Sequence, residues 1–203
     1  MNPRTAIASR IAFPVVVLSL LLAGCAGGGD RLAEDYQNGS GAGYVSGDGS
    51  IITVAADERG DAVEFGGELD SGERLTSSDF GDRVVVVNFW YASCPPCREE
   101  ADDLETLSRQ YGGDVVFVGV NLNDTATVAK TFATEHGVSY PSFIDYQDSA
   151  VQLAFATTAL PPLAPPSTIV LDAEGRVAAR ISAPITASSP LGDIIDDLRA
   201  EAS

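Results

Sequence analysis

Basic residues are scarce in this chain of 203 residues, where 12 lysines and arginines stand against 29 aspartates and glutamates. The formal net charge at pH 7 is therefore −17. A surface of that charge repels the phosphates of nucleic acids and the headgroups of anionic lipids. The composition predicts no nucleic-acid partner and no membrane attachment based on charge. An acidic surface favours basic client proteins, but it also serves solubility alone.

Side chains that bind metals are equally few. The chain has one histidine, His136, and three cysteines, Cys25, Cys94 and Cys97. A structural zinc site usually takes four ligands, which a single C-x-x-C pair and one histidine do not supply. His136 directly precedes Gly137, a position typical of the end of a helix. No glycine-rich phosphate-binding motif occurs either, so we expect no metal or nucleotide cofactor.

The apolar run at residues 11–22 is shorter than the roughly 20 residues that a spanning helix needs. The residues before it include two arginines and no acid, and small residues follow it. This order is typical of a secretory signal, so we predict a signal peptide at residues 1–24. A plain cleaved signal that leaves a stray thiol and an uncleaved membrane anchor are the alternatives.

The sequence Leu22-Ala23-Gly24-Cys25 resembles the bacterial lipobox, where the signal is cut before the cysteine and the cysteine is lipidated. The resemblance implies a protein anchored by lipidated Cys25 to the outer face of the cell membrane. Lipidation of Cys25 also explains an odd number of cysteines in an exported chain, because the other two remain as a pair. Residues 25–60 are rich in Gly, Ser and Asp and are predicted to form a flexible tether.

Cys94-Pro95-Pro96-Cys97 follows the apolar run at residues 84–90 and opens a helical pattern. A buried-type strand that leads into C-x-x-C at a helix start is the layout of a dithiol redox site. We expect Cys94 to face solvent as the nucleophile, with a pKa lowered by the helix N-terminus. Cys97, one turn further, is expected to face the core and to resolve the mixed disulfide.

A permanent disulfide staple in a non-enzymatic binding lipoprotein is the alternative from another class. A disulfide that closes so short a loop constrains the unfolded chain little, and a helix start exposes it. The sequence therefore favours a redox-active Cys94–Cys97 disulfide as the functional group, without any other cofactor.

The pattern of apolar residues predicts a single α/β domain at residues 61–203, which opens with a β-hairpin within residues 63–75. Strand, helix and strand then form a parallel βαβ unit, and a later pair of strands is antiparallel. The expected sheet is mixed, with helices on both faces. Later strands are predicted at 84–90, 115–120, 142–144, 167–171 and 177–181; helices are predicted after Cys94, at 123–135 with Val128, Phe132 and Ala133 inward, at 150–155, and around Leu191, Ile194, Ile195 and Leu198.

These motifs carry a family resemblance that covers nearly all of residues 61–203. Val-Val-Asn-Phe-Trp before Cys-Pro-Pro-Cys-Arg, Glu100, and Pro166-Ser167-Thr168 resemble the thioredoxin-like proteins of the TlpA/ResA type. These are thiol-disulfide oxidoreductases tethered outside bacterial cells, and Leu-Pro-Pro before the proline loop resembles actinobacterial members. The chain departs from the family at Ser93, usually Trp, and at Asp102, often Pro. The resemblance therefore carries no expectation about the shape of the client-docking surface.

The resemblance implies a thioredoxin-like fold and two further site residues. Pro166 is expected to be cis and to pack against the disulfide, with Pro165 or Pro162 as the competing assignment. Glu100 is expected beside the cysteines, since Asn88 replaces the buried aspartate of thioredoxin. If Glu100 is partly buried, its pKa rises and it can accept the proton of Cys97. An exposed helix acid is the alternative.

The expected activity is that of a protein disulfide reductase. Glu99, Glu100, Asp102 and Asp103 crowd the first turns of the helix and oppose a thiolate, which favours a reducing couple. The expected partners are client thiols and disulfides, with apocytochrome c as the client that the family suggests, and a membrane thiol-disulfide electron donor. An oxidase or isomerase of secreted proteins would use the same residues and stays the alternative.

Overall fold

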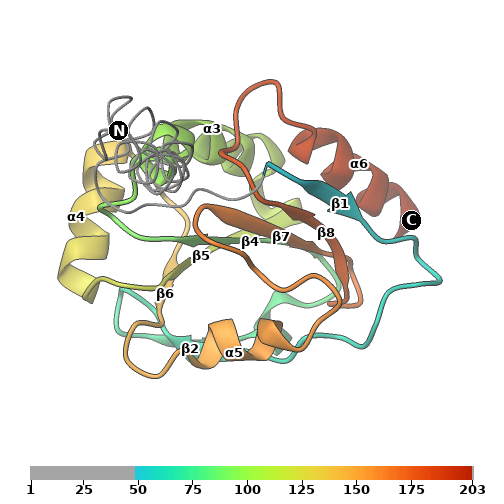
Figure 1. Cartoon of the computed structure of the whole chain (residues 1–203), viewed down its shortest axis with the longest axis horizontal. Coiled ribbons are helices and arrows are strands. Elements are labelled where there is room, and N and C mark those ends of the chain that lie inside the picture. Colours follow the sequence, from blue (N-terminus) through green and yellow to red (C-terminus); the bar gives the residue numbers. More distant parts are fainter. Residues whose placement is uncertain (1–48, 203) are drawn as a thin grey trace, which may run out of the picture. The chain divides into compact units, whose positions relative to one another are not determined.

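The computed structural model describes residues 49–202 (Figure 1). The predicted signal peptide, Cys25 and most of the predicted tether lie outside the described residues. In chain order the elements are β1 (Ile51–Thr53), β2 (Gly66–Glu68), β3 (Arg74–Thr76), η1 (Ser77–Phe80), β4 (Val84–Trp90), α3 (Pro95–Tyr111), η2 (Gly112–Asp114), β5 (Val115–Asn121), α4 (Ala126–His136), β6 (Ser142–Ile144), α5 (Ala150–Ala156), β7 (Ser167–Leu171), β8 (Val177–Ile181) and α6 (Leu191–Glu201).

A mixed sheet has the strand order β1-β8-β7-β4-β5-β6. The central strand β4 is parallel to β5 and antiparallel to β7. β5 and β6 are also parallel, whereas β8 is antiparallel to both of its neighbours, β7 and β1. The β2–β3 pair forms the hairpin expected within residues 63–75. The predicted mixed sheet is therefore confirmed.

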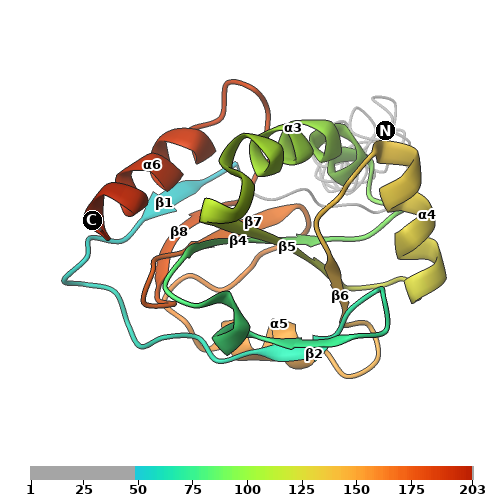
Figure 2. The same cartoon turned by 180° about the vertical axis from the view of Figure 1, so that it is seen from behind.

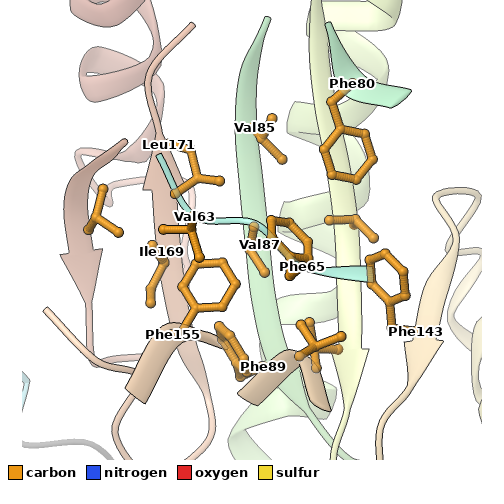
Figure 3. Packing of buried hydrophobic residues seen from close by; sticks show 14 of the residues in the cluster. Val63, Phe65, Phe80, Val85, Val87, Phe89, Phe143, Phe155, Ile169 and Leu171 are labelled. Carbon is orange, nitrogen blue, oxygen red and sulfur yellow. The ribbon is translucent and has the colours of Figure 1, made fainter. Parts of the chain in front are cut away.

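Every residue of β4 is buried, because side chains from both of its faces meet a hydrophobic cluster. Val85, Val87 and Phe89 face the cluster that includes Phe65 and Phe155 (Figure 3). The alternate residues of β4 face the opposite side of the sheet, as the two-residue period of a strand requires. A strand that is covered on both faces has apolar residues at nearly every position, and residues 84–90 show this pattern in the sequence.

Helices α3 and α6 cover one face of the sheet, and α5 with the β2–β3 hairpin covers the other (Figures 1 and 2). Helix α4 lies beside α3, and its Phe132 packs on Trp90 of β4 with ring centroids 4.4 Å apart. Leu191, Ile195 and Leu198 of α6 are buried, as their helical spacing predicts. The prediction of helices on both faces is confirmed.

The predicted start of the folded domain at Asp61 was wrong, because β1 already belongs to the sheet. Its backbone pairs with β8, and Ile51 lies opposite Ile181. Ile51 and Ile52 are 48% and 38% exposed, so β1 is held by backbone hydrogen bonds at the sheet edge and not by a buried face. Residues 51–54 are mostly apolar and could form a short strand, but the polar residues at 55–61 that follow them separate this run from the rest of the domain in the sequence.

The predicted inward face of α4 was wrong at one position. Val128 is 43% exposed, whereas Ala129 is 1% exposed and Phe132 is 5% exposed. The helix begins at Ala126, three residues later than predicted. Because alanine is only weakly hydrophobic, the apolar period in the sequence selects Val128, although Ala129 is the residue that is buried.

Candidate active site

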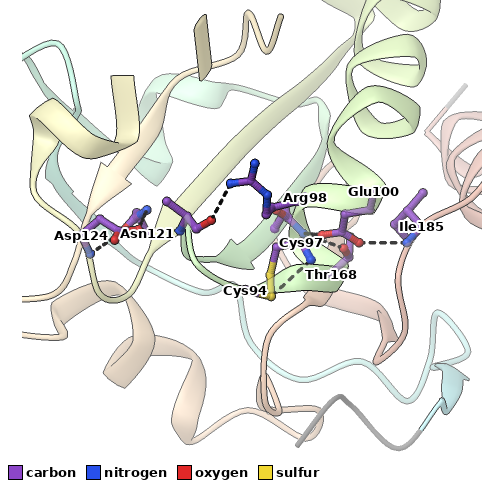
Figure 4. The surroundings of a disulfide bond; sticks show 10 residues. Cys94, Cys97, Arg98, Glu100, Asn121, Asp124, Thr168 and Ile185 are labelled. Carbon is purple, nitrogen blue, oxygen red and sulfur yellow. Dashed lines mark hydrogen bonds between the residues drawn. A yellow bond between two sulfur atoms is a disulfide. The ribbon is translucent and has the colours of Figure 1, made fainter. Parts of the chain in front are cut away.

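The two cysteines of the C-x-x-C motif form a disulfide at the start of α3 (Figure 4). Their sulfurs are 2.04 Å apart and their Cα atoms 5.3 Å apart. Cys94 is the N-cap of the helix, and its Sγ accepts the N–H of Cys97 at 3.2 Å. Pro95 and Pro96 occupy the first helical positions, where an N–H would have no partner within the helix.

Cys97 faces the core as predicted, with 3% of its surface exposed. The prediction that Cys94 faces solvent was wrong for this oxidised form, because Cys94 is 0% exposed. As the N-cap, Cys94 turns its sulfur back over the first turn of α3, toward the Cys97 amide. A position just before a helix therefore does not by itself place a cysteine sulfur on the surface.

Glu100 is buried one helical turn behind Cys97, with 1% of its surface exposed. Its Oε1 accepts Asn88 Nδ2–H and its Oε2 accepts the backbone N–H of Ile185, both at 2.8 Å (Figure 4). Residues three apart on a helix share one face, so Glu100 and Cys97 lie on the same side of α3. The interpretation of Glu100 as an exposed helix acid was wrong.

Burial raises the pKa of Glu100 to about 7, and the hydrogen bonds from Ile185 and Asn88 only partly oppose this rise. Among the described residues, no lysine or arginine forms an ion pair with Glu100. A carboxyl whose charge is disfavoured by burial and is not offset by a cation changes protonation near neutral pH. Glu100 is therefore suited to exchange protons under physiological conditions.

Asn88 links Glu100 to the strand that follows the proline loop. It is 4% exposed, and its Nδ2 also donates to Thr168 Oγ1 at 3.2 Å. Asn88 and Thr168 are direct partners in the β4–β7 ladder. Sequence analysis missed Thr168 as part of this network, although the pairing of the two strands could have indicated it. The amide of Ile185 was also missed, because a backbone donor leaves no mark on the sequence.

The peptide bond between Pro165 and Pro166 is cis, as the resemblance implies for Pro166. No other cis bond occurs in residues 49–202, so the competing assignments to Pro165 and Pro162 were wrong. Pro166 is buried and directly precedes β7. Because β7 runs antiparallel to β4, with Ser167 opposite Phe89, Pro166 lies at the end of β4 that leads to the disulfide.

A cavity of about 10 Å³ lies behind the disulfide, close to the smallest space that holds one water. Cys97 lines this cavity and is 3% exposed, so little solvent reaches its sulfur. A larger cavity of about 540 Å³ lies between residues 54–64 and 154–159, and no redox residue lines it. The small cavity is lined by Asn88, Trp90, Cys97, Ala101, Leu104, Phe132, Ala133, Val138, Tyr140 and Ser142.

His136 ends α4, as predicted, and its ring stacks on Phe132. In the part of the chain that the structure describes, no cluster of His, Cys, Asp or Glu is arranged to hold a metal ion. No helix within the same residues is long and apolar enough to cross a membrane.

The chain is similar to known proteins from several bacteria. A solved DsbF homologue from Corynebacterium diphtheriae is 32% identical, with a TM-score of 0.64 over 76% of this chain and 97% of that one. The thiol:disulfide interchange protein DsbE homolog of Paracoccus denitrificans is 33% identical over 50% of this chain and 52% of its own length. The thiol-disulfide oxidoreductase ResA of Bacillus subtilis is 28% identical over 64% of this chain and 70% of its own.

The chain thus spans about half the length of the Paracoccus relative that it matches. Together with the sheet order and the disulfide at the start of α3, these relatives confirm the thioredoxin-like fold and the resemblance to the TlpA/ResA type. The family model described as Redoxin matches residues 55–195, from the end of the first strand to the last helix. The chain belongs to the Redoxin family.

Proposed function

We propose that this protein is a thiol-disulfide oxidoreductase, anchored outside the cell membrane, that reduces disulfides in client proteins. The proposal is carried by the Cys94–Cys97 disulfide at the start of α3 with the carboxyl of Glu100 buried one turn behind it. Relatives named thiol-disulfide oxidoreductase and thiol:disulfide interchange protein support the same chemistry.

The first step is the attack of Cys94 in the dithiol form. Its thiolate forms a bond to one sulfur of a client disulfide, and the other client sulfur leaves as a thiolate that takes a proton from water. The N–H of Cys97, which points at the Cys94 sulfur in this structure, and the helix N-terminus stabilise the attacking thiolate.

The second step releases the client. The Cys97 thiol gives its proton to the Glu100 carboxylate, and the resulting thiolate attacks the Cys94 sulfur of the mixed disulfide. The second client sulfur leaves as a thiolate, so two electrons have passed from the dithiol to the client. A carboxyl with a pKa near 7 is a better acceptor for a thiol of pKa about 8.5 than an ordinary glutamate. The disulfide in the structure is the product of this step.

Charges near the helix start support the proposed direction of electron flow. The first turn of α3 contains exposed Arg98 and no acidic residue, whereas the next turn carries exposed Glu99 and Asp102. Negative charge near Cys94 disfavours its thiolate, and a less stabilised thiolate makes the couple more reducing. These acids support a reductase over an oxidase or isomerase of secreted proteins.

The reduction potential of the Cys94–Cys97 couple, measured by equilibration with thiol buffers, tests this function. We expect a value near that of thioredoxin, about −270 mV, or lower. A value near about −120 mV would instead make the protein an oxidant of secreted proteins. If the Cys94–Cys97 disulfide does not equilibrate with any thiol buffer, it is a permanent structural disulfide and not a redox-active one.

The anchor and the client need separate tests. Lipidation at Cys25 predicts that the wild type cofractionates with membranes and that Cys25→Ala does not, and an unchanged distribution would contradict the lipid anchor.

Apocytochrome c is the client that the TlpA/ResA resemblance suggests, so we expect the dithiol protein to reduce an oxidised C-x-x-C-H peptide. A thiol-disulfide electron donor in the membrane would then regenerate the dithiol.

A further inference from the structure

In the turn between β4 and α3, the backbone of one residue, Ala92, makes hydrogen bonds to two side chains from outside the turn. Its N–H donates to Asp124 Oδ2 at 2.6 Å, and its carbonyl accepts Arg98 Nη1–H at 3.3 Å. Ala92 lies two residues before Cys94 and belongs to no helix or strand. The Asp124 contact is a short, charge-assisted hydrogen bond to the backbone, a class of bond stronger than a neutral pair.

Asp124 is itself fixed by the end of the neighbouring strand (Figure 4). Asn121, the last residue of β5, is 0% exposed and donates from Nδ2 to the same Asp124 Oδ2 at 2.9 Å. Asn121 Oδ1 accepts the backbone N–H of Asp124 at 2.7 Å. Trp90 and Asn121 are direct partners in the β4–β5 ladder. The two loops thus leave the sheet side by side, and one carboxylate joins them.

The constraint on Cys94 differs between the two redox forms. In the oxidised form a covalent bond to Cys97 holds the Cys94 side chain. In the dithiol form that bond is absent, and the backbone around Cys94 depends on the bonds of the turn. These include Cys94 N–H to the Tyr91 carbonyl at 3.1 Å and Ala92 N–H to Asp124. The Asp124 bond ties the turn to the loop that follows β5, and it is the shortest of these bonds.

We infer that Asp124 is a positioning residue, which acts through Ala92 to hold Cys94 over the start of α3 when the site is in its dithiol form. The inference rests on the proposed function and adds a residue to that same site. Asp124 does not touch the sulfur, and its effect comes from the fixed geometry of the turn. A displacement of about 1 Å in a reacting group is enough to slow a reaction markedly.

Three variants of the full-length protein test this role. Asp124→Ala removes the acceptor. Asp124→Asn keeps it, because both donors meet the same oxygen and the amide carbonyl can take its place. Asp145→Ala is the matched control, since Asp145 also accepts backbone N–H groups, those of Val151 and Gln152 at the start of α5, on the opposite face of the sheet.

The measurement is the rate at which reduced protein attacks the small aromatic disulfide dithiobis-nitrobenzoate, at a temperature where circular dichroism shows each variant folded. We expect Asp124→Ala to slow the attack about tenfold, and Asp124→Asn and Asp145→Ala to stay within about twofold of wild type. If Asp124→Ala does not fold, Asp124→Ser, whose hydroxyl is too short to reach Ala92, is expected to show the same slowing.

Three results would overturn the inference: wild-type rates for Asp124→Ala, equal slowing by Asp124→Ala and Asp145→Ala, or no rescue by Asp124→Asn. Failure of the proposed function has a different signature. In that case the wild-type protein itself fails to exchange with thiols or has the potential of an oxidant, whatever residue stands at position 124.

Discussion

Helix α3 contains two buried carboxylates, Glu100 and Glu105, whose pKa values are shifted in opposite directions. They are 1% and 6% exposed. The pKa of Glu100 is raised to about 7, whereas the pKa of Glu105 is lowered below its usual value. Two residues of the same type, on one helix and with similar exposure, therefore have different charges near neutral pH.

The difference lies in the groups around each carboxylate. Burial tends to raise the pKa of Glu105 as well, but the Ser139 N–H at 2.7 Å and the Arg109 guanidinium at 2.5 Å outweigh it. Glu105 also accepts the Ser139 hydroxyl at 2.8 Å. Glu100 has two neutral donors, and no cation in residues 49–202 forms an ion pair with it. Glu100 lies in the more strongly desolvating surroundings and its donors carry no charge, so it is the carboxylate that can exchange a proton near neutral pH.

The largest effect is expected from Glu100→Gln. It removes the proton acceptor but keeps the shape of the side chain, and Asn88 can turn its amide carbonyl toward the new NH₂ group. We expect the resolution of a mixed disulfide by Cys97 to slow about 100-fold at pH 7, a typical loss for general base catalysis. Rapid-mixing kinetics with a preformed mixed disulfide measure this step.

Glu105→Gln is the matched control for that measurement, because it makes the same chemical change one and a half turns further along α3. Its resolution rate is expected to equal that of the wild type. Equal rates for Glu100→Gln and the wild type would show that Cys97 gives its proton to another group.

The second effect concerns stability as a function of pH. Because the pKa of Glu100 in the folded protein is about 7 against a usual 4.5, only the unfolded chain ionises there as the pH rises between these values. Stability therefore falls from pH 4.5 to pH 7 and then stays level, by about 3 kcal/mol in total from this group. Urea unfolding of wild type and Glu100→Gln across this range gives the contribution as a difference. A difference that does not change with pH would contradict the raised pKa.

The third effect concerns Glu105, whose role we expect to be structural. Glu105→Ala leaves the Ser139 amide and the Arg109 guanidinium without their acceptor, so we expect a loss of about 2 kcal/mol in unfolding free energy at pH 7. The rate of disulfide exchange should stay unchanged. A slower exchange without loss of stability would mean that the two carboxylates share one function.

The smallest effect is expected from Arg109→Met, which removes the cation from Glu105 and keeps most of the side-chain length. The Arg109 side chain is 69% exposed, and exposed ion pairs contribute little, so the expected loss is about 0.5 kcal/mol. Urea unfolding at low salt measures it. A loss as large as that of Glu105→Ala would show that the ion pair, and not the Ser139 contacts, stabilises this region.

The sequence predicted most of the fold because its strands and helices carry strong periodicity. The all-buried strand β4 is an apolar run with matching bounds, and α6 shows its inward stripe. The exceptions are explained by weak contrast. Strand β1 lies in a short apolar run that polar residues separate from the rest of the domain, and α4 turns an alanine inward, so the hydrophobic pattern assigns neither to the core.

Prediction of the site succeeded where side-chain chemistry defines it and failed where the backbone does. The cysteine pair was identified from the residues, and Glu100 and Pro166 from the family resemblance. The amide of Ile185 and the turn at Ala92 were not, because backbone groups have no signature in a sequence. The burial of Cys94 was missed for a related reason, since it depends on the orientation of a helix cap and not on residue type.

The most direct test of this account is a ¹³C NMR titration of the Glu100 and Glu105 carboxyl carbons in the oxidised protein. We predict a midpoint near 7 for Glu100 and one below the usual 4.5 for Glu105. A midpoint at or below 4.5 for Glu100 would contradict the account, because the carboxyl would then be too weak a base to take the proton of Cys97.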